Sequence, residues 1–190
     1  LFVTRSFSLR TYGGCERGVA ALEFAIVTPF LILLLLGGFE MARFLIVQQK
    51  AEKIAFSVAD VTAQYESVTS TEISQVFAAV EQIMKPHPFN TNGRVILSSV
   101  YNPDGTEKPK VRWQCENAGA LNVVSKVGKV GNDATLPQTF LLDEKDNLIV
   151  TEVFYRFTPV FKTIFTGPFV VYRTAMFRPR LGPLTSAPGC

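Results

Sequence analysis

The feature that most constrains this chain is an apolar run near its N-terminus, which extends from Val19 to Phe39. At about 1.5 Å per residue, a helix over this run is roughly 30 Å long, which matches the hydrocarbon core of a bilayer. The rest of the chain is too short and too well patterned to surround such a helix inside a large soluble domain. We therefore predict one membrane-spanning helix over residues 19–39.

The apolar run contains one carboxylate, Glu23, just inside its leading edge. An acid in hydrocarbon costs about 3 kcal/mol on insertion scales, so it needs a partner or a route to water. No Lys or Arg lies between Glu23 and Glu40. Cleavage after Gly18 would give Val19 a free ammonium four residues before Glu23, and this group, or its copy on a neighbouring subunit, could neutralise the acid. The alternative is that Glu23 lies at the membrane interface and reaches water.

The residues around this acid follow a recognisable order. Gly18 precedes four small or apolar residues, then Glu23, Phe24 and the hydrophobic segment. The continuation Ala-Leu-Glu-Phe-Ala-Ile-Val-Thr-Pro-Phe-Leu-Ile-Leu-Leu, with Gly-Gly-Phe-Glu after it, is similar to TadE-like minor pilins (pseudopilins) of the tight-adherence (Flp) pilus system. The resemblance implies that a prepilin peptidase cleaves between Gly18 and Val19 on the cytoplasmic side. It also implies that Glu23 and Phe24 set the register of assembly.

The charges before the span indicate its orientation. Residues 1–18 carry three arginines and one acid, and positive charge beside a span favours the cytoplasmic side. We predict a cytoplasmic leader over 1–18 and a periplasmic domain over 40–190, with the protein in the inner membrane. A conventional signal peptide fits less well, because the run is longer than an ordinary h-region and no Ala-x-Ala site follows it. The first residue is Leu, which leaves open a truncated leader or an alternative start.

The three cysteines are Cys15, Cys115 and Cys190. Cys15 belongs to the leader, whereas the other two would form an even pair in an oxidising compartment. We predict a Cys115–Cys190 disulfide, which would stabilise the fold by roughly 4 kcal/mol in the chain-entropy model. The alternative is two unrelated thiols, one of them on a frayed C-terminus.

Beyond the span, three- and four-residue spacing of apolar residues predicts that the helix continues as an amphipathic stem over 40–66. The predicted buried face comprises Val47, Ala51, Ile54, Ala55, Val58, Val61 and Tyr65. A second helix follows, since Thr69 and Glu72 have the spacing of a capping box. The segment Pro86-His-Pro88 is expected to end it.

The apolar period then changes to two, which is typical of strands. We predict strands over Arg94–Asn102, Lys110–Cys115, Leu148–Pro159 and Phe169–Arg178, with Val111, Trp113 and Cys115 on one face. Residues 116–146 are not assigned to an element. The predicted fold is α+β, with the long N-terminal helix and a second helix packed on an antiparallel sheet of about four strands, as in pilins. The segments that end at Cys115, Pro159 and Arg180 also look similar to the C-terminal half of TadE-like proteins.

Enzyme and nucleic-acid classes fit poorly. The only histidine, His87, lies between prolines, and a zinc site lacks ligands unless carboxylates complete it. No Gly-x-Ser-x-Gly, phosphate-binding or dinucleotide motif occurs, and Asp143-Glu-Lys-Asp146 is typical of a solvated turn. The net charge is only +3, without a basic block. We therefore expect no catalytic residues, no metal, no cofactor and no nucleic-acid partner.

The leading hypothesis is a minor pilin that a prepilin peptidase matures and that is needed to assemble Flp-type pili. Its partners would be membrane lipid, the peptidase, the Flp pilin, other minor pilins and the assembly machinery. A second hypothesis is an uncleaved single-pass anchor that presents a periplasmic binding or adhesion module. A third and weaker one is a membrane-anchored hydrolase whose catalytic residues the sequence does not identify, and substitution of His87 would test it.

Overall fold

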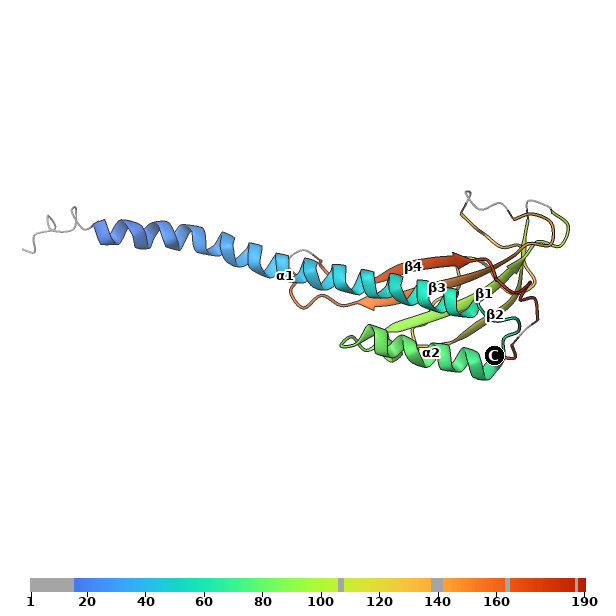
Figure 1. Ribbon diagram of the computed structural model, residues 1–190. Coiled ribbons are helices and arrows are strands. Elements are labelled where there is room, and N and C mark those ends of the chain that lie inside the picture. The colour runs from blue at the N-terminus through green and yellow to red at the C-terminus, as the bar shows by residue number, and fades with distance from the viewer. Residues whose placement is uncertain (1–15, 106–107, 138–141, 163–164, 187) are drawn as a thin grey trace, which may run out of the picture.

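The computed structural model describes residues 16–105, 108–137, 142–162, 165–186 and 188–190. It has a long N-terminal helix and an α+β head (Figure 1), which confirms the predicted fold class. The elements are α1 (Glu16–Thr62), α2 (Ser70–Met84), α3 (Phe89–Asn92), β1 (Gly93–Tyr101), β2 (Lys110–Ala118), β3 (Asn147–Phe157) and β4 (Phe169–Phe177). Most of the predicted leader, with Cys15, lies outside the described residues.

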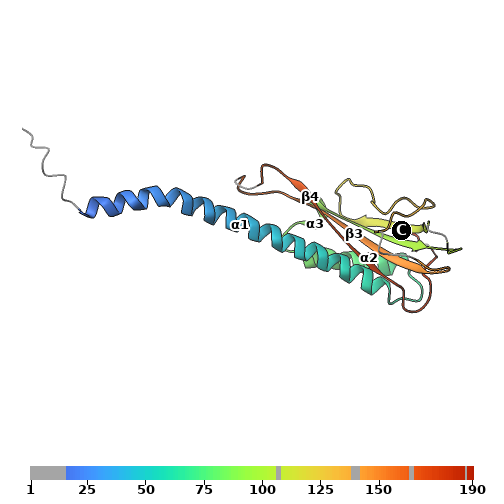
Figure 2. The same ribbon diagram turned by 90° about the horizontal axis from the view of Figure 1, so that it is seen from above.

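Helix α1 is a single helix of 47 residues, about 70 Å long. Its N-terminal half projects from the head, whereas its C-terminal half lies across the sheet (Figures 1 and 2). The helix ends at Thr62, before the predicted end of the stem at residue 66. Val61 is predicted to be buried but is 38% exposed, whereas Ala59, which is not predicted to be buried, is in the core.

Helix α2 has the start and end that the sequence predicts. The Thr69 side chain accepts a hydrogen bond from the backbone N–H of Glu72, and the Glu72 carboxylate accepts one from the backbone N–H of Thr69 at 2.8 Å. These reciprocal bonds are the predicted capping box. The helix ends at Met84, before Pro86. Both signals are local in sequence, which is why they are readable without the fold.

The four strands form one antiparallel sheet in the order β2-β1-β3-β4. Helices α1 and α2 cover one face of this sheet, and the main core lies between them (Figure 1). Side chains alternate along β3, as the apolar period of two indicates, because Val153, Tyr155 and Phe157 belong to that core. Phe154 packs on the opposite face.

A β-bulge in β2 overturns one prediction. Ser99 pairs with Trp113. The next residue, Val100, pairs with Val111, so β2 has one extra residue at this point. The extra residue reverses the alternation of side chains. Val111 therefore packs with Val100 on the face away from the helices, while Trp113 and Cys115 face the helices.

The second face of the sheet is covered by the segment that joins β2 to β3, which the sequence left unassigned. Three of its residues are buried against the strands: Leu121, Val127 and Leu142. Glu152 of β3 is fully buried beneath this segment and accepts hydrogen bonds from the Lys126 backbone N–H at 2.9 Å and the Tyr172 hydroxyl at 3.0 Å. Burial, and then the Glu152 carboxylate, raise the pKa of the Tyr172 hydroxyl above its usual range. An ordered connection between strands is thus part of the core.

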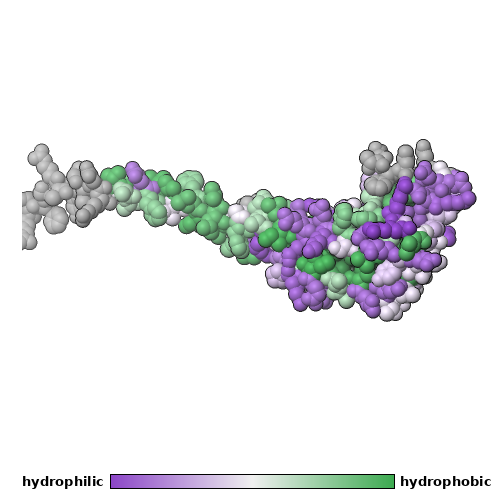
Figure 3. Space-filling model, viewed as in Figure 1, coloured by the Kyte–Doolittle hydropathy of each residue, from purple (hydrophilic) through white to green (hydrophobic). Residues whose placement is uncertain are grey.

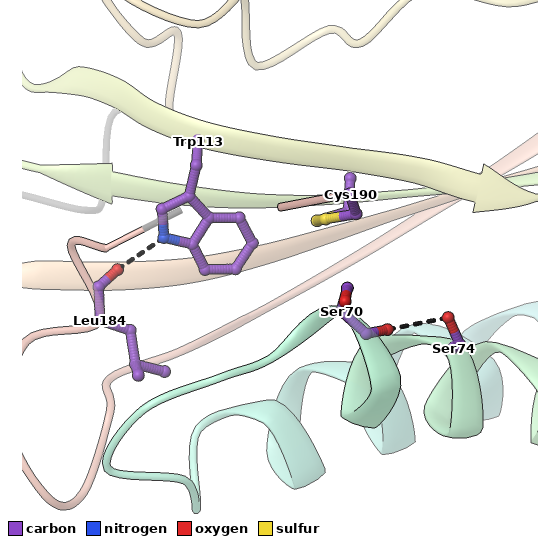
Figure 4. The surroundings of a disulfide bond; sticks show 6 residues. Ser70, Ser74, Trp113, Leu184 and Cys190 are labelled. Carbon is purple, nitrogen blue, oxygen red and sulfur yellow. Dashed lines mark hydrogen bonds between the residues drawn. A yellow bond between two sulfur atoms is a disulfide. The ribbon is translucent and has the colours of Figure 1, made fainter. Parts of the chain in front are cut away.

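The C-terminal tail returns to the sheet and is held by its backbone (Figure 4). The Leu184 carbonyl accepts hydrogen bonds from Ser99 Oγ at 2.7 Å and from Trp113 Nε1 at 2.8 Å. The Leu184 N–H donates to Asn147 Oδ1 at 2.9 Å. Trp113 is therefore a core residue whose polar atom fixes the tail, and the docked tail brings Cys190 toward β2.

Candidate functional site

The projecting half of α1 is the most unusual surface of the molecule. Its most apolar window of 18 residues has a mean hydropathy of 2.5, and none of that window is buried. Apolar side chains cover it, whereas the face of the head that Figure 3 shows carries many polar residues. A core helix of a soluble protein would be covered by its own chain. This helix fits a single-pass membrane anchor, which needs lipid or other subunits around it.

The predicted cleavage site lies near the start of α1, where Gly18 and Val19 are both exposed. A Cβ atom added at Gly18 would meet no heavy atom within 4 Å. Glycine in a helix costs about 0.5–1 kcal/mol relative to alanine. The fold therefore supplies no steric reason for glycine at this position.

Glu23 and Phe24 project from the same bare helix. Phe24 is 67% exposed, and Glu23 is also exposed. No ion pair formed among the described residues involves Glu23. Val19 lies four residues earlier, so the two side chains are neighbours on one face of the helix. The four predicted N-terminal site residues are thus all exposed near the start of α1.

A second acid, Glu40, closes the apolar run, and the sequence prediction gave it no role. Its side chain is fully buried. It accepts hydrogen bonds from the backbone N–H groups of Val160 at 3.1 Å and Phe161 at 3.0 Å. Arg43 Nη1 pairs with its other oxygen at 3.1 Å. Glu40 therefore ties α1 to the loop between β3 and β4. The Glu-x-x-Arg spacing was visible in the sequence, but the loop amides are 120 residues away.

Aromatic rings fill the space around this junction. Phe44 of α1 lies 5.6 Å from Phe157, 5.2 Å from Phe165 and 5.4 Å from Phe169, measured between ring centroids. The Arg43 guanidinium lies 5.6 Å from the Phe157 centroid. Edge-to-face packing of this kind adds to the energy of burial. Helix α1 consequently enters the head at a packed cluster of aromatic side chains around Phe44.

His87 is half-buried near Tyr155, with their ring centroids 6.4 Å apart. Burial lowers the pKa of the imidazole, and the charges of Arg43 and Lys50 lower it further. The neighbours of His87 are thus the cations of Arg43 and Lys50 and the ring of Tyr155. The described residues contain no group of three or more His, Cys, Asp or Glu side chains that could hold a metal ion.

The acidic turn before β3 has an intramolecular role. Asp146 pairs with Arg178 at 2.8 Å. Lys145 has a φ of 62° and donates its backbone N–H to the Asn102 carbonyl at 2.7 Å. These bonds connect the turn to the end of β1 and the residue after β4.

Cys115 and Cys190 form a disulfide in the structure, with Cα atoms 5.5 Å apart and a sequence separation of 75. Cys115 is buried in the core beside the helices. The bond joins the last residue of the chain to β2. Together with the Leu184 bonds, it ties the C-terminal tail to the sheet at two points.

These observations define a class: an α+β head on a long helix that fits a single-pass membrane anchor. Residues 18–60 match the family model of TadE-like proteins, which confirms the resemblance found in the sequence. The match begins at Gly18 and ends within α1, so it covers the anchor and the stem. Comparison with curated proteins and with solved structures gives no match.

Proposed function

We propose that this chain is a minor pilin (pseudopilin) that a prepilin peptidase matures and that is needed to assemble Flp-type pili. One observation carries the proposal: the TadE-like match starts at Gly18, two residues into α1 and just before the exposed apolar segment that contains Glu23. The glycine is not required by the fold. Recognition of Gly18 by a peptidase would account for it.

The proposed location is the inner membrane, with the N-terminus cytoplasmic and the head periplasmic. The arginine-rich leader supports this orientation. The Cys115–Cys190 pair supports it as well, because disulfides persist in the periplasm and are rare in the cytoplasm.

Cleavage would change the electrostatics of the helix. Before it, Glu23 has no cation among its described neighbours on the anchor. After it, the Val19 ammonium lies one helical turn away, within reach of Glu23 on the same helix or on an adjacent one. In a bundle of such helices, this pairing would fix the axial register between subunits, and the exposed Phe24 would pack on the neighbouring helix. Maturation would thereby make the subunit competent to join the Flp pilin and other minor pilins.

The cleavage step can be tested with two matched glycines of α1. The full chain is co-expressed with a prepilin peptidase, and its N-terminus is determined in membranes. Gly18→Ala should abolish cleavage. Gly38→Ala should leave it intact, although a Cβ at either position meets nothing within 4 Å. Equal cleavage of both variants would overturn the assignment of the site.

The register step needs a separate variant. Glu23→Gln keeps the shape of the side chain and removes its charge. We expect this variant to be cleaved normally and to be lost from the pilus assembly complex, as measured by co-purification with the Flp pilin. Full incorporation would remove the role of Glu23 and leave the cleavage unaffected. An uncleaved wild-type chain would favour an anchored binding or adhesion module.

A further inference from the structure

The apolar surface of the molecule does not end with the predicted span. On the outward side of α1, Met41 is 38% exposed, Leu45 49% and Ile46 45%. On the loop between β3 and β4, whose backbone binds Glu40, Val160 is 60% exposed. We call this surface the collar, and it consists of Phe39, Met41, Leu45, Ile46, Val160 and Phe161.

The contacts of the loop place it level with the outer end of the span. The rings of Phe39 and Phe161 lie 6.1 Å apart, and Phe39 is the last residue of the apolar run. The Glu40 carboxylate binds the backbone of the loop directly. In Figures 1 and 2 the described part of the β3–β4 loop lies along α1 on the side of the head nearest the projecting half of the helix. A membrane that surrounds the helix up to Phe39 therefore reaches the loop as well.

The polar groups of this region point inward. Glu40 is fully buried and is paired with Arg43 and two amides. Burial of this charge is costly without such partners, so the polar atoms of Glu40 are satisfied within the molecule. Lys162 is exposed next to the collar and can extend its ammonium toward phosphate groups. Apolar side chains with a flanking cation suit the interface between acyl chains and headgroups.

We propose that the collar is a docking surface for phospholipid, and that the β3–β4 loop rests in the outer interface of the membrane that α1 spans. This rests on the membrane anchoring in the proposed function. The collar is continuous with the span, which argues for lipid as its occupant. A helix alone leaves the head free to tilt and rotate. The loop gives the head a second contact with the bilayer, and the Glu40 bonds hold that contact at a fixed height on the helix.

The contact can be measured by tryptophan fluorescence of the full chain in vesicles of phosphatidylcholine and phosphatidylglycerol. The probe is Val160→Trp. Its matched control is Val130→Trp, because Val130 is 55% exposed and lies at the far end of the head, where the next residue, Gly131, donates to the Val111 carbonyl. The native Trp113 is buried and gives the same background in both variants. Phosphatidylcholine brominated near the headgroup end of its acyl chains quenches only indoles at that depth.

We expect brominated lipid to quench most of the added fluorescence of Val160→Trp and little of that of Val130→Trp. Iodide in the buffer should instead quench Val130→Trp more strongly than Val160→Trp. Equal access of iodide to both probes, in protein that floats with the vesicles, would overturn the collar and leave the anchor and the proposed function standing. Protein that does not float with the vesicles would overturn the anchor together with the collar. In the Glu40→Ala background, we expect the Val160→Trp signal to shift toward iodide, and an unchanged signal would refute the role of Glu40.

Discussion

The two halves of α1 have the same secondary structure and opposite relations to the rest of the chain. Before residue 36 almost every side chain is exposed and apolar, whereas the half beyond Glu40 buries a strip of small aliphatic residues against the sheet and α2. Backbone hydrogen bonds maintain a helix in both cases. The two halves differ in what covers their apolar side chains. The C-terminal half is covered by the sheet and α2, whereas the projecting half needs lipid or other subunits around it.

The acids at the two ends of the apolar run repeat this contrast. Glu40 has partners in its own chain, the amides of Val160 and Phe161 and the Arg43 guanidinium. Glu23 pairs with no described side chain. Hence the fold supplies the partners of Glu40, whereas among the described residues it supplies no ion pair to Glu23. The predictions that follow compare substitutions in the two halves by their effect on the free energy of unfolding of the head.

The largest expected effect concerns the cysteines. Cys190→Ser should lower the free energy of unfolding of the head by about 4 kcal/mol, because the disulfide closes a long loop in the unfolded chain. Denaturant titration followed by the fluorescence of Trp113 would measure it in detergent. Cys15→Ser, in the leader, is the control and should leave the midpoint unchanged. Equal midpoints for the two variants would mean that the disulfide does not contribute.

Two leucines from the two halves give the next effect. Leu97 of β1 is 0% exposed, whereas Leu34 of the projecting helix is 74% exposed. Leu97→Ala should cost about 3 kcal/mol through lost burial and the cavity left behind. Leu34→Ala should leave the unfolding of the head unchanged, since it removes no contact in the head. A loss of similar size for both would break the division between the halves.

The acids give a third matched pair. Glu40→Ala leaves the amides of Val160 and Phe161 and the Arg43 guanidinium without their acceptor, and should cost about 2 kcal/mol. Glu40→Gln retains an oxygen that can accept from the amides and should cost less. For Glu23→Ala we expect an unchanged midpoint in the same titration. A stable Glu40→Ala variant would show that the joint between helix and head does not depend on this acid.

The smallest effect is a dependence on pH. The pKa of His87 in the folded protein lies below its ordinary value of 6.5, chiefly because of burial and then because of Arg43 and Lys50. The unfolded chain therefore binds the proton more readily, and stability should fall as the pH drops below about 6.5. His87→Gln should flatten this part of the stability profile. A profile that is the same in both proteins would contradict the assigned environment of His87.

Much of this fold could be predicted from sequence because its signals are local. The capping box of α2, the end of that helix before Pro86 and the alternation in β3 each lie within a few residues. The apolar run likewise identifies the anchor from composition alone. The turn at Thr166-Gly-Pro168 similarly fixes where β4 begins.

What could not be predicted depends on partners far away in the sequence. The bulge that reverses Val111 is defined by its pairing with β1. The burial of Glu40 depends on amides in a loop that follows β3. Glu152 likewise depends on the backbone N–H of Lys126, in the segment that joins β2 to β3. In each case the sequence shows the type of residue but does not show which distant residue it contacts.

The central claim is that the bare helix belongs to a processed subunit, and the mature N-terminus tests it most directly. Mass spectrometry of the protein isolated from the membranes of its native host would identify that residue. The account predicts Val19, with Glu23 as the fifth residue of the mature chain. A protein that retains residues of the segment 1–18 would contradict it and would leave an ordinary anchored domain in its place.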